Sequence, residues 1–154
     1  MQMITEILPK ELVLSEIKAE SKNEALMEFA EAIARVYPFL DKGDVAQVLL
    51  EREKLGSTGV QEGIAIPHGK LKDLDRMLIS FGRSTKGIDF QSHDSKLTHL
   101  FFVLLAPENE AGMHLKVLAR LSRLLKSGSL RDKLLKAKDA NEIYETLVTE
   151  EKKI

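Results

Sequence analysis

The chain has 154 residues, of which 44% are hydrophobic and 31% charged, and its formal net charge is -1. A chain of this length buries a sizeable core, so we expect a single domain over residues 1–154. The near-neutral charge provides no basic field for nucleic acid, and the absence of cysteine excludes disulfides, thiolate metal sites and cysteine nucleophiles.

From the sequence we expect neither a signal peptide nor a membrane span. Its N-terminus lacks a basic stretch followed by an apolar core, and the longest apolar run, residues 100–106, is too short to cross a bilayer. We therefore expect a cytoplasmic protein with no direct membrane insertion and no nucleic-acid partner.

The first third of the chain predicts one strand and two helices. The apolar residues Leu12-Val13-Leu14 and Ile17 suggest a first strand. A capping residue, Ser21, then opens a helix that ends at Pro38, and Asp41 opens a second helix that ends near Gly56.

The middle of the chain predicts strands. Short apolar runs at residues 64–66 and 77–81 are typical of strands, and residues 97–105 form the strongest strand pattern. Because this last run is almost wholly apolar, we expect it at the centre of a sheet. Strands that alternate with helices indicate an α/β layer fold.

The last third of the chain predicts helices. A long helix is expected from about Glu110 to Lys126, a short one opened by Ser129, and a last one opened by Asp139. The charged residues 150–153 are expected to form a frayed end.

The most informative stretch combines an apolar run, a proline, a histidine and a glycine: Gly63-Ile64-Ala65-Ile66-Pro67-His68-Gly69. A proline cannot continue a strand ladder, so we expect the backbone to leave the sheet and the imidazole of His68 to face the surface. A neutral imidazole is available near neutral pH. The alternative is an incidental histidine at a strand end.

Four other residues are candidates for an anion site. His114 lies in the first turn of the long helix, where free N–H groups attract anions, and it can meet His68 there; alternatively it is only a half-buried cap. Arg52 either clamps a phosphate or extends into solvent. Ser57 and Thr58, between two glycines, offer hydroxyls and accessible N–H groups.

The histidine spacings match no metal motif, and we expect no metal and no cofactor. The four histidines are His68, His93, His99 and His114.

Residues 50–71 resemble the active-site signature of the mannitol/fructose-type IIA domains of the bacterial phosphotransferase system (PTS). The matching stretch is Leu50-Glu51-Arg52-Glu53-Lys54-Leu55-Gly56-Ser57-Thr58-Gly59-Val60-Gln61-Glu62-Gly63-Ile64-Ala65-Ile66-Pro67-His68-Gly69-Lys70-Leu71. Looser similarity extends over the rest of the chain. Within the family, Ser21-Lys22 and the residues around His68 are most similar to the free-standing nitrogen-regulatory type, EIIA-Ntr.

The resemblance implies a fold and a set of roles. The fold would be a single mixed β-sheet flanked by helices on both faces. His68 would accept a phosphoryl group on Nε2 from HPr or its nitrogen-branch counterpart. His114 and Arg52 would stabilise that group, with Ser57 and Thr58 nearby.

Two functions remain open on this basis. The first is a regulatory protein whose partners respond to the phosphorylation of His68. The second is a IIA component that relays phosphate to a separate IIB chain of a fructose/mannitol-type sugar transporter. The family's IIB domain is phosphorylated on cysteine, and this chain has none, which favours regulation. A purely structural adaptor without phosphate chemistry is a weaker alternative.

Overall fold

The computed structural model describes residues 3–154, which form a five-stranded sheet and five α-helices after two short 3-10 turns. The strands are β1 (Val13–Leu14), β2 (Ile64–Ala65), β3 (His68–Leu71), β4 (Leu78–Ile88) and β5 (Thr98–Pro107). The helices are α1 (Lys22–Val36), α2 (Lys42–Lys54), α3 (Ala111–Leu124), α4 (Gly128–Lys136) and α5 (Ala140–Glu151). The 3-10 turns are Ile4–Glu6 and Lys10–Leu12.

The sheet is mixed, and β5 lies at its centre as the sequence predicts. Strand β4 pairs with β5 in antiparallel fashion and with β1 in parallel. On the other side of β5, β2 and β3 follow one another along the same edge, both parallel to β5. Strand β5 is buried almost throughout because helices cover both of its faces.

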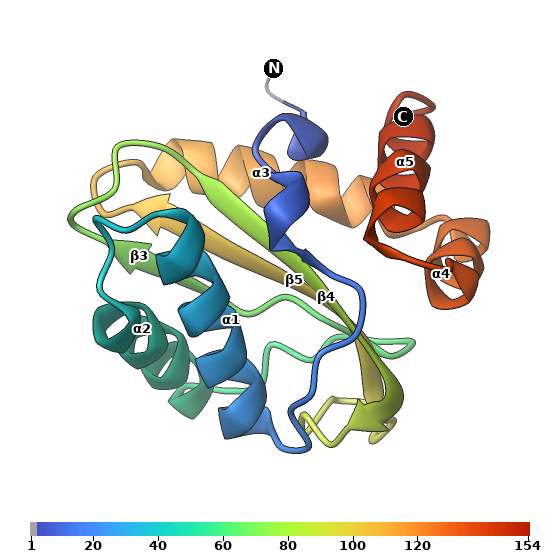
Figure 1. The fold of residues 1–154 in the computed structure, drawn as a ribbon, viewed down its shortest axis with the longest axis horizontal. Helices are drawn as coiled ribbons and strands as arrows, with labels where there is room; N and C mark the ends of the chain where they lie inside the picture. The colour runs from blue at the N-terminus through green and yellow to red at the C-terminus, as the bar shows by residue number, and fades with distance from the viewer. Residues whose placement is uncertain (1–2) are drawn as a thin grey trace.

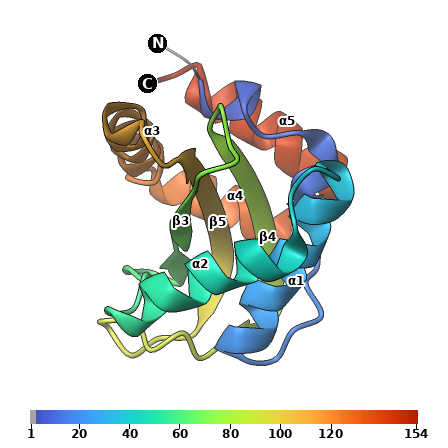
Figure 2. The ribbon, with the colours of Figure 1, turned by 90° about the vertical axis from the view of Figure 1, so that its left-hand side faces the viewer.

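The helices cover the sheet on both faces, as the fold class predicts. Figure 1 shows α1 and α2 on one side of the strands and α3, α4 and α5 on the other. Figure 2 shows α2 crossing in front of the sheet and α4 behind it. Alternating side chains of β5 reach the two layers: Phe101 packs 5.9 Å from the ring of Phe29 on α1, whereas Phe102 packs against Phe81 of β4.

The predicted helix starts are confirmed at three positions and wrong at one. The side chains of Ser21, Asp41 and Asp139 each accept a hydrogen bond from the third residue of their helix. The fourth cap is Ser127, whose hydroxyl accepts from the backbone of Leu130, so the prediction of Ser129 was wrong by half a turn.

The prediction for the proline at position 67 requires a second correction. Its ring removes one N–H from the ladder, but its carbonyl still accepts a hydrogen bond from the Leu104 amide. Pairing with β5 resumes at once, with His68 opposite Leu104. The backbone therefore stays in the sheet, and His68 is the first residue of an edge strand instead of the start of an outward turn.

The C-terminal end is also not frayed. Glu151 is fully buried, and its carboxylate accepts hydrogen bonds from the backbone amides of Ile4 and Thr5 and from the side chain of Arg120. Glu150 is buried as well, and it forms an ion pair with a lysine of α4. Residues 150–153 were expected to be a solvated, frayed end. Instead, Glu151 connects α5 to the N-terminal 3-10 turn and to α3.

Candidate functional site

A pocket of about 720 Å³ opens at the sheet edge where β3 lies between α2 and α3. Strand β3 contributes His68, α2 contributes Arg52, and α3 contributes His114. The structure thus brings together three candidates that are separated by up to 62 positions in the chain. The remaining lining residues are Val48, Glu51, Leu55, Gly69, Lys70, Ala111, Leu115 and Leu118.

The imidazole of His68 is held by two hydrogen bonds. Its Nδ1 lies 2.9 Å from the carbonyl oxygen of Ile66, and its Nε2 accepts a hydrogen bond of 3.1 Å from Nε of Arg52. Because a carbonyl oxygen can only accept, Nδ1 carries the proton. The lone pair is therefore on Nε2, the nitrogen that faces the pocket, so the ring is in the tautomer that can act as a nucleophile there.

His114 lies beside this ring in the first turn of α3. The centroids of the two imidazoles are 5.3 Å apart, and their planes meet at 68°. His114 is only 8% exposed, and its Nε2 is the one buried side-chain nitrogen or oxygen in residues 3–154 without a hydrogen-bond partner. A buried polar atom without a partner is costly, so this nitrogen has hydrogen-bonding capacity that the described residues leave unused.

The pKa of His114 lies below its ordinary value. Burial is the main cause, and the nearby His68 and Lys70 lower the pKa further. His114 is therefore neutral near pH 7, and its ring can offer a hydrogen bond without adding a full charge.

Arg52 is half-buried at the end of α2 and does not extend freely into solvent. Besides its contact with His68, its Nη1 donates a 2.9 Å hydrogen bond to the carbonyl oxygen of Gly56. This second bond ties the guanidinium to the loop that follows the helix, so its planar fork is oriented before any ligand arrives.

Ser57 and Thr58 are the two candidates that the structure does not bring into the pocket. The hydroxyl of Ser57 donates to the carbonyl oxygen of Phe90. Thr58 is buried, and both its amide and its hydroxyl bind the carboxylate of Glu53. These groups hold the loop in place, and neither residue lines the pocket.

Sequence reasoning missed Lys70 and the apolar rim of the pocket. Lys70 follows His68 by two strand positions and points to the same side, as strand alternation could have shown. Leu55 and Leu115 are 84% and 67% exposed, respectively, and flank the pocket mouth. These two leucines add exposed apolar area to the rim of a pocket that is also lined by cationic and histidine side chains.

The arrangement suits an anion and a nucleophilic nitrogen. One neutral imidazole nitrogen faces a guanidinium, an ammonium and a second neutral imidazole. In the part of the chain that the structure describes, no three His, Cys, Asp or Glu side chains gather as a metal ion would require. Nor does any helix over residues 3–154 have the length and apolar character needed to cross a membrane.

The fold and the site together define a phosphotransferase-system EIIA protein. Residues 6–149 match the family described as "Phosphoenolpyruvate-dependent sugar phosphotransferase system, EIIA 2", and the chain belongs to this family. The resemblance read from residues 50–71 is thereby confirmed.

Two relatives show which kinds of EIIA protein the chain is similar to. It is 43% identical to a nitrogen regulatory protein of Bradyrhizobium diazoefficiens over 94% of both chains. It is also 35% identical to the fructose-specific EIIABC component of Bacillus subtilis, covering 94% of this chain but 23% of that protein.

Among solved structures, the nitrogen regulatory protein IIA-Ntr of Neisseria meningitidis superposes with a TM-score of 0.87 at 35% identity. The match covers 94% of this chain and 98% of that one. The mannitol-specific IIA enzyme of Escherichia coli, in complex with phosphorylated IIB, matches with a TM-score of 0.76 at 27% identity. That match covers 90% of this chain and 95% of the other.

Proposed function

We propose that the chain is a phosphohistidine carrier and regulator that receives a phosphoryl group on Nε2 of His68. The observation that carries the proposal is the lone pair of this nitrogen, which faces an open pocket between Arg52 and His114. Similarity to nitrogen regulatory proteins over 94% of the chain supports the regulatory role.

The transfer step needs no metal ion in this account. His68 Nε2 attacks the phosphorus of a phosphohistidine on the donor protein, the new N–P bond forms in line with the old one, and the donor nitrogen keeps the electron pair of the broken bond. The His68 ring gains positive charge in this step. Its Nδ1–H, already donating to the Ile66 carbonyl, stabilises that charge.

The pocket residues act on the phosphoryl oxygens. Arg52 releases Nε2 as the group approaches, and its guanidinium then binds two oxygens. The unpartnered Nε2 of His114 donates to a third oxygen when it carries the proton. These donors lie on packed elements, α2 and α3, so the backbone needs little reorganisation during transfer, and the main change is in the Arg52 side chain.

The donor in this proposal is an HPr-type phosphocarrier protein that docks on the rim of the pocket. The exposed Leu55 and Leu115 provide apolar contact, and Lys70 provides positive charge beside the labile group. Coverage by a partner excludes water and protects the N–P bond from hydrolysis. We place the protein in the cytoplasm with its donor.

A second candidate function is relay of the phosphoryl group to a separate IIB chain. It is supported by the 35% identity to the fructose-specific EIIABC component and by the structural match to a mannitol IIA enzyme in complex with phosphorylated IIB. The same His68 site serves both functions, so they differ only in the protein that meets the phosphorylated form.

The test is phosphate transfer from labelled phosphoenolpyruvate through Enzyme I and an HPr-type carrier. We expect one acid-labile, base-stable phosphate per chain, and none on His68→Ala. His93→Ala removes an exposed histidine outside the pocket and should label normally. Labelling of His68→Ala to the wild-type level would overturn the assignment. Comparison of general and nitrogen-branch carriers then identifies the donor.

A further inference from the structure

A second pocket lies next to the His68 site, in the same groove between α3 and the sheet edge. Successive alternate positions of this edge line the two pockets: Ile64 and Ile66 line the second, and His68 and Lys70 the first. Helix α3 likewise lines the first pocket with its N-terminal half and the second from Ser122 onward. The two pockets are therefore neighbours that share two walls.

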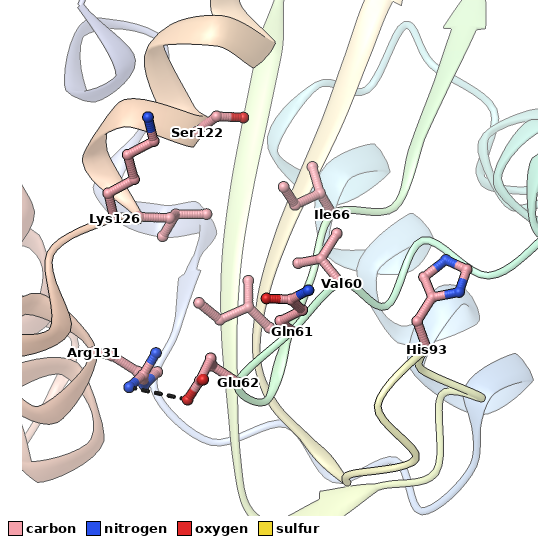
Figure 3. Close-up of a pocket in the computed structure, with 10 residues that line it drawn as sticks. Val60, Gln61, Glu62, Ile66, His93, Ser122, Lys126 and Arg131 are labelled. Atoms are coloured by element: carbon pink, nitrogen blue, oxygen red, sulfur yellow. Dashed lines mark ion pairs between the residues drawn. The ribbon is translucent and has the colours of Figure 1, made fainter.

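The walls of this second pocket are largely apolar and its size suits a small molecule. Its volume is about 500 Å³, within the range of roughly 300–1,000 Å³ that is usual for ligand sites. Figure 3 shows Ser122 and Lys126 on one side and Val60 and Ile66 on the other. Leu125 adds a further aliphatic side chain.

Three charged side chains stand at this pocket. Arg131 and Glu62 form an ion pair of 3.3 Å, visible in Figure 3 as a dashed line. The ammonium group of Lys126, in contrast, has no hydrogen-bond or ion-pair partner within residues 3–154. The pocket therefore holds two cations and one carboxylate, and the unpaired charge is positive.

From this combination we infer that the second pocket binds a small aliphatic carboxylate. Its hydrocarbon chain lies against Val60, Ile66 and Leu125, and its carboxylate pairs with Lys126. Charge complementarity decides the class of ligand, because a carboxylate is attracted by the exposed ammonium of Lys126, whereas a cation is repelled by it.

Occupancy of this pocket acts on His68 through one residue. The side chain of Ile66 lines the second pocket, while its carbonyl oxygen accepts the Nδ1–H of His68. A ligand that contacts the side chain thus bears on the group that fixes the tautomer and orientation of the imidazole. This part rests on the proposed function, and it makes the carboxylate a regulator of phosphoryl transfer.

Binding is tested by NMR titration of the ¹⁵N-labelled unphosphorylated protein with hexanoate. We expect saturable amide shifts at residues 60–66 and at the end of α3. The neutral analogue 1-hexanol and the cationic analogue hexylamine should bind more weakly. Equal binding of the alcohol, shifts that do not saturate, or shifts that follow protein concentration alone, as a second copy in the pocket would produce, each overturn the inference.

Variants at the rim give opposite expectations. Lys126→Gln should weaken hexanoate binding about threefold, the size of one partly exposed charge contact. Glu62→Gln should strengthen it by a similar factor, because Arg131 is then free to pair with the ligand. Lys116→Gln, on an exposed face of α3 outside both pockets, removes the same charge and should bind hexanoate like the wild type.

The coupling is tested separately by the rate of phosphoryl transfer to His68 with and without saturating hexanoate. We expect hexanoate to change the rate of transfer to the wild type. At the same hexanoate concentration, the change should be smaller for Lys126→Gln, to the extent that this variant binds hexanoate more weakly. If hexanoate binds and His68 is never labelled, the proposed function fails and the site stands. If labelling is normal and hexanoate does not bind, only the site fails; binding without any rate change overturns the coupling.

Discussion

The imidazoles of His68 and His114 meet edge to face, with their centroids 5.3 Å apart, although one belongs to an edge strand and the other to a helix. Neither element alone positions the pair, because β3 and α3 are both held by their packing against β5. The site is therefore a product of tertiary structure, and changes in packing are expected to reach the chemistry.

Folding stability should depend on pH through His114. Because burial holds its pKa below the ordinary value of 6.5, the unfolded chain binds a proton at this residue more readily than the folded one. Stability should therefore fall as the pH decreases through 6.5 toward the lower pKa of the folded state. Urea unfolding at several pH values should show a smaller decrease for His114→Gln than for the wild type. His93→Gln, at an exposed position, should leave this decrease unchanged.

Arg52→Ala should slow phosphoryl transfer by about 100-fold, since it removes preformed donors to the phosphoryl oxygens. Arg52→Lys keeps the charge but lacks the planar fork, and its transfer rate should lie between those of the wild type and Arg52→Ala. Rapid-quench measurements with the phosphorylated carrier give these rates. Arg35→Ala, at an exposed position of α1, is the control for charge loss. A wild-type rate for Arg52→Ala would remove this residue from the site.

Glu151→Ala should destabilise the fold by about 3–5 kcal/mol, because it leaves the buried amides of Ile4 and Thr5 without an acceptor and removes the buried ion pair with Arg120. Glu145→Ala, an exposed change on the same helix, should alter stability by less than about 0.5 kcal/mol. Denaturant unfolding measures both. Equal midpoints for the two variants would contradict the structural role of Glu151.

We also expect the protein to lose stability in acid through the carboxylate of Glu151. Burial alone would raise the pKa of Glu151, but hydrogen bonds from Thr5, Arg120 and Ile4 outweigh it and hold the pKa below the ordinary 4.5. Its stabilising contribution is thus complete above that value and lost as the pH falls further. The N-terminal amides should lose hydrogen-exchange protection in this acid range, well below the range in which His114 acts.

Gly69→Ala should disturb both stability and transfer. A Cβ at this position would lie 2.9 Å from Cγ2 of Val48, on the helix that carries Arg52, so either the Val48 side chain or α2 has to shift. We expect a loss of about 1–3 kcal/mol and slower phosphorylation. A second change, Val48→Ala, restores the space and should recover part of both in a double-mutant cycle. Gly112→Ala, with nothing within 4 Å, should not destabilise the fold.

Local signals predicted much of the fold. The caps at Ser21, Asp41 and Asp139 depend on a hydrogen bond to the third residue of the same helix, so spacing alone reveals them. The same rule failed at Ser129, which has Asp132 three positions on, because the cap is Ser127, which has Leu130 at that spacing instead of an acidic residue. Helical periodicity likewise placed His114 on the core-facing side of a helix start, where it could meet His68.

What the sequence could not reveal depends on distant partners. Glu151 reads as a solvated charge, and only the amides of Ile4 and Thr5, 147 and 146 positions earlier, explain its burial. Ser57 and Thr58 read as anion ligands until Phe90 and Glu53 are seen to accept their hydrogen bonds. Short-range rules contain no information about such contacts.

The bonds from Ile4 and Thr5 to Glu151 bring the two ends of the described chain together on the surface. A short linker there can join residue 154 to residue 3, and new ends can be opened at the exposed turn of Asp75 and Arg76. Such a circularly permuted protein keeps β5 and its neighbouring strands continuous. We expect such a protein to keep the same architecture, because the contacts between its segments would be unchanged although their order along the chain differs.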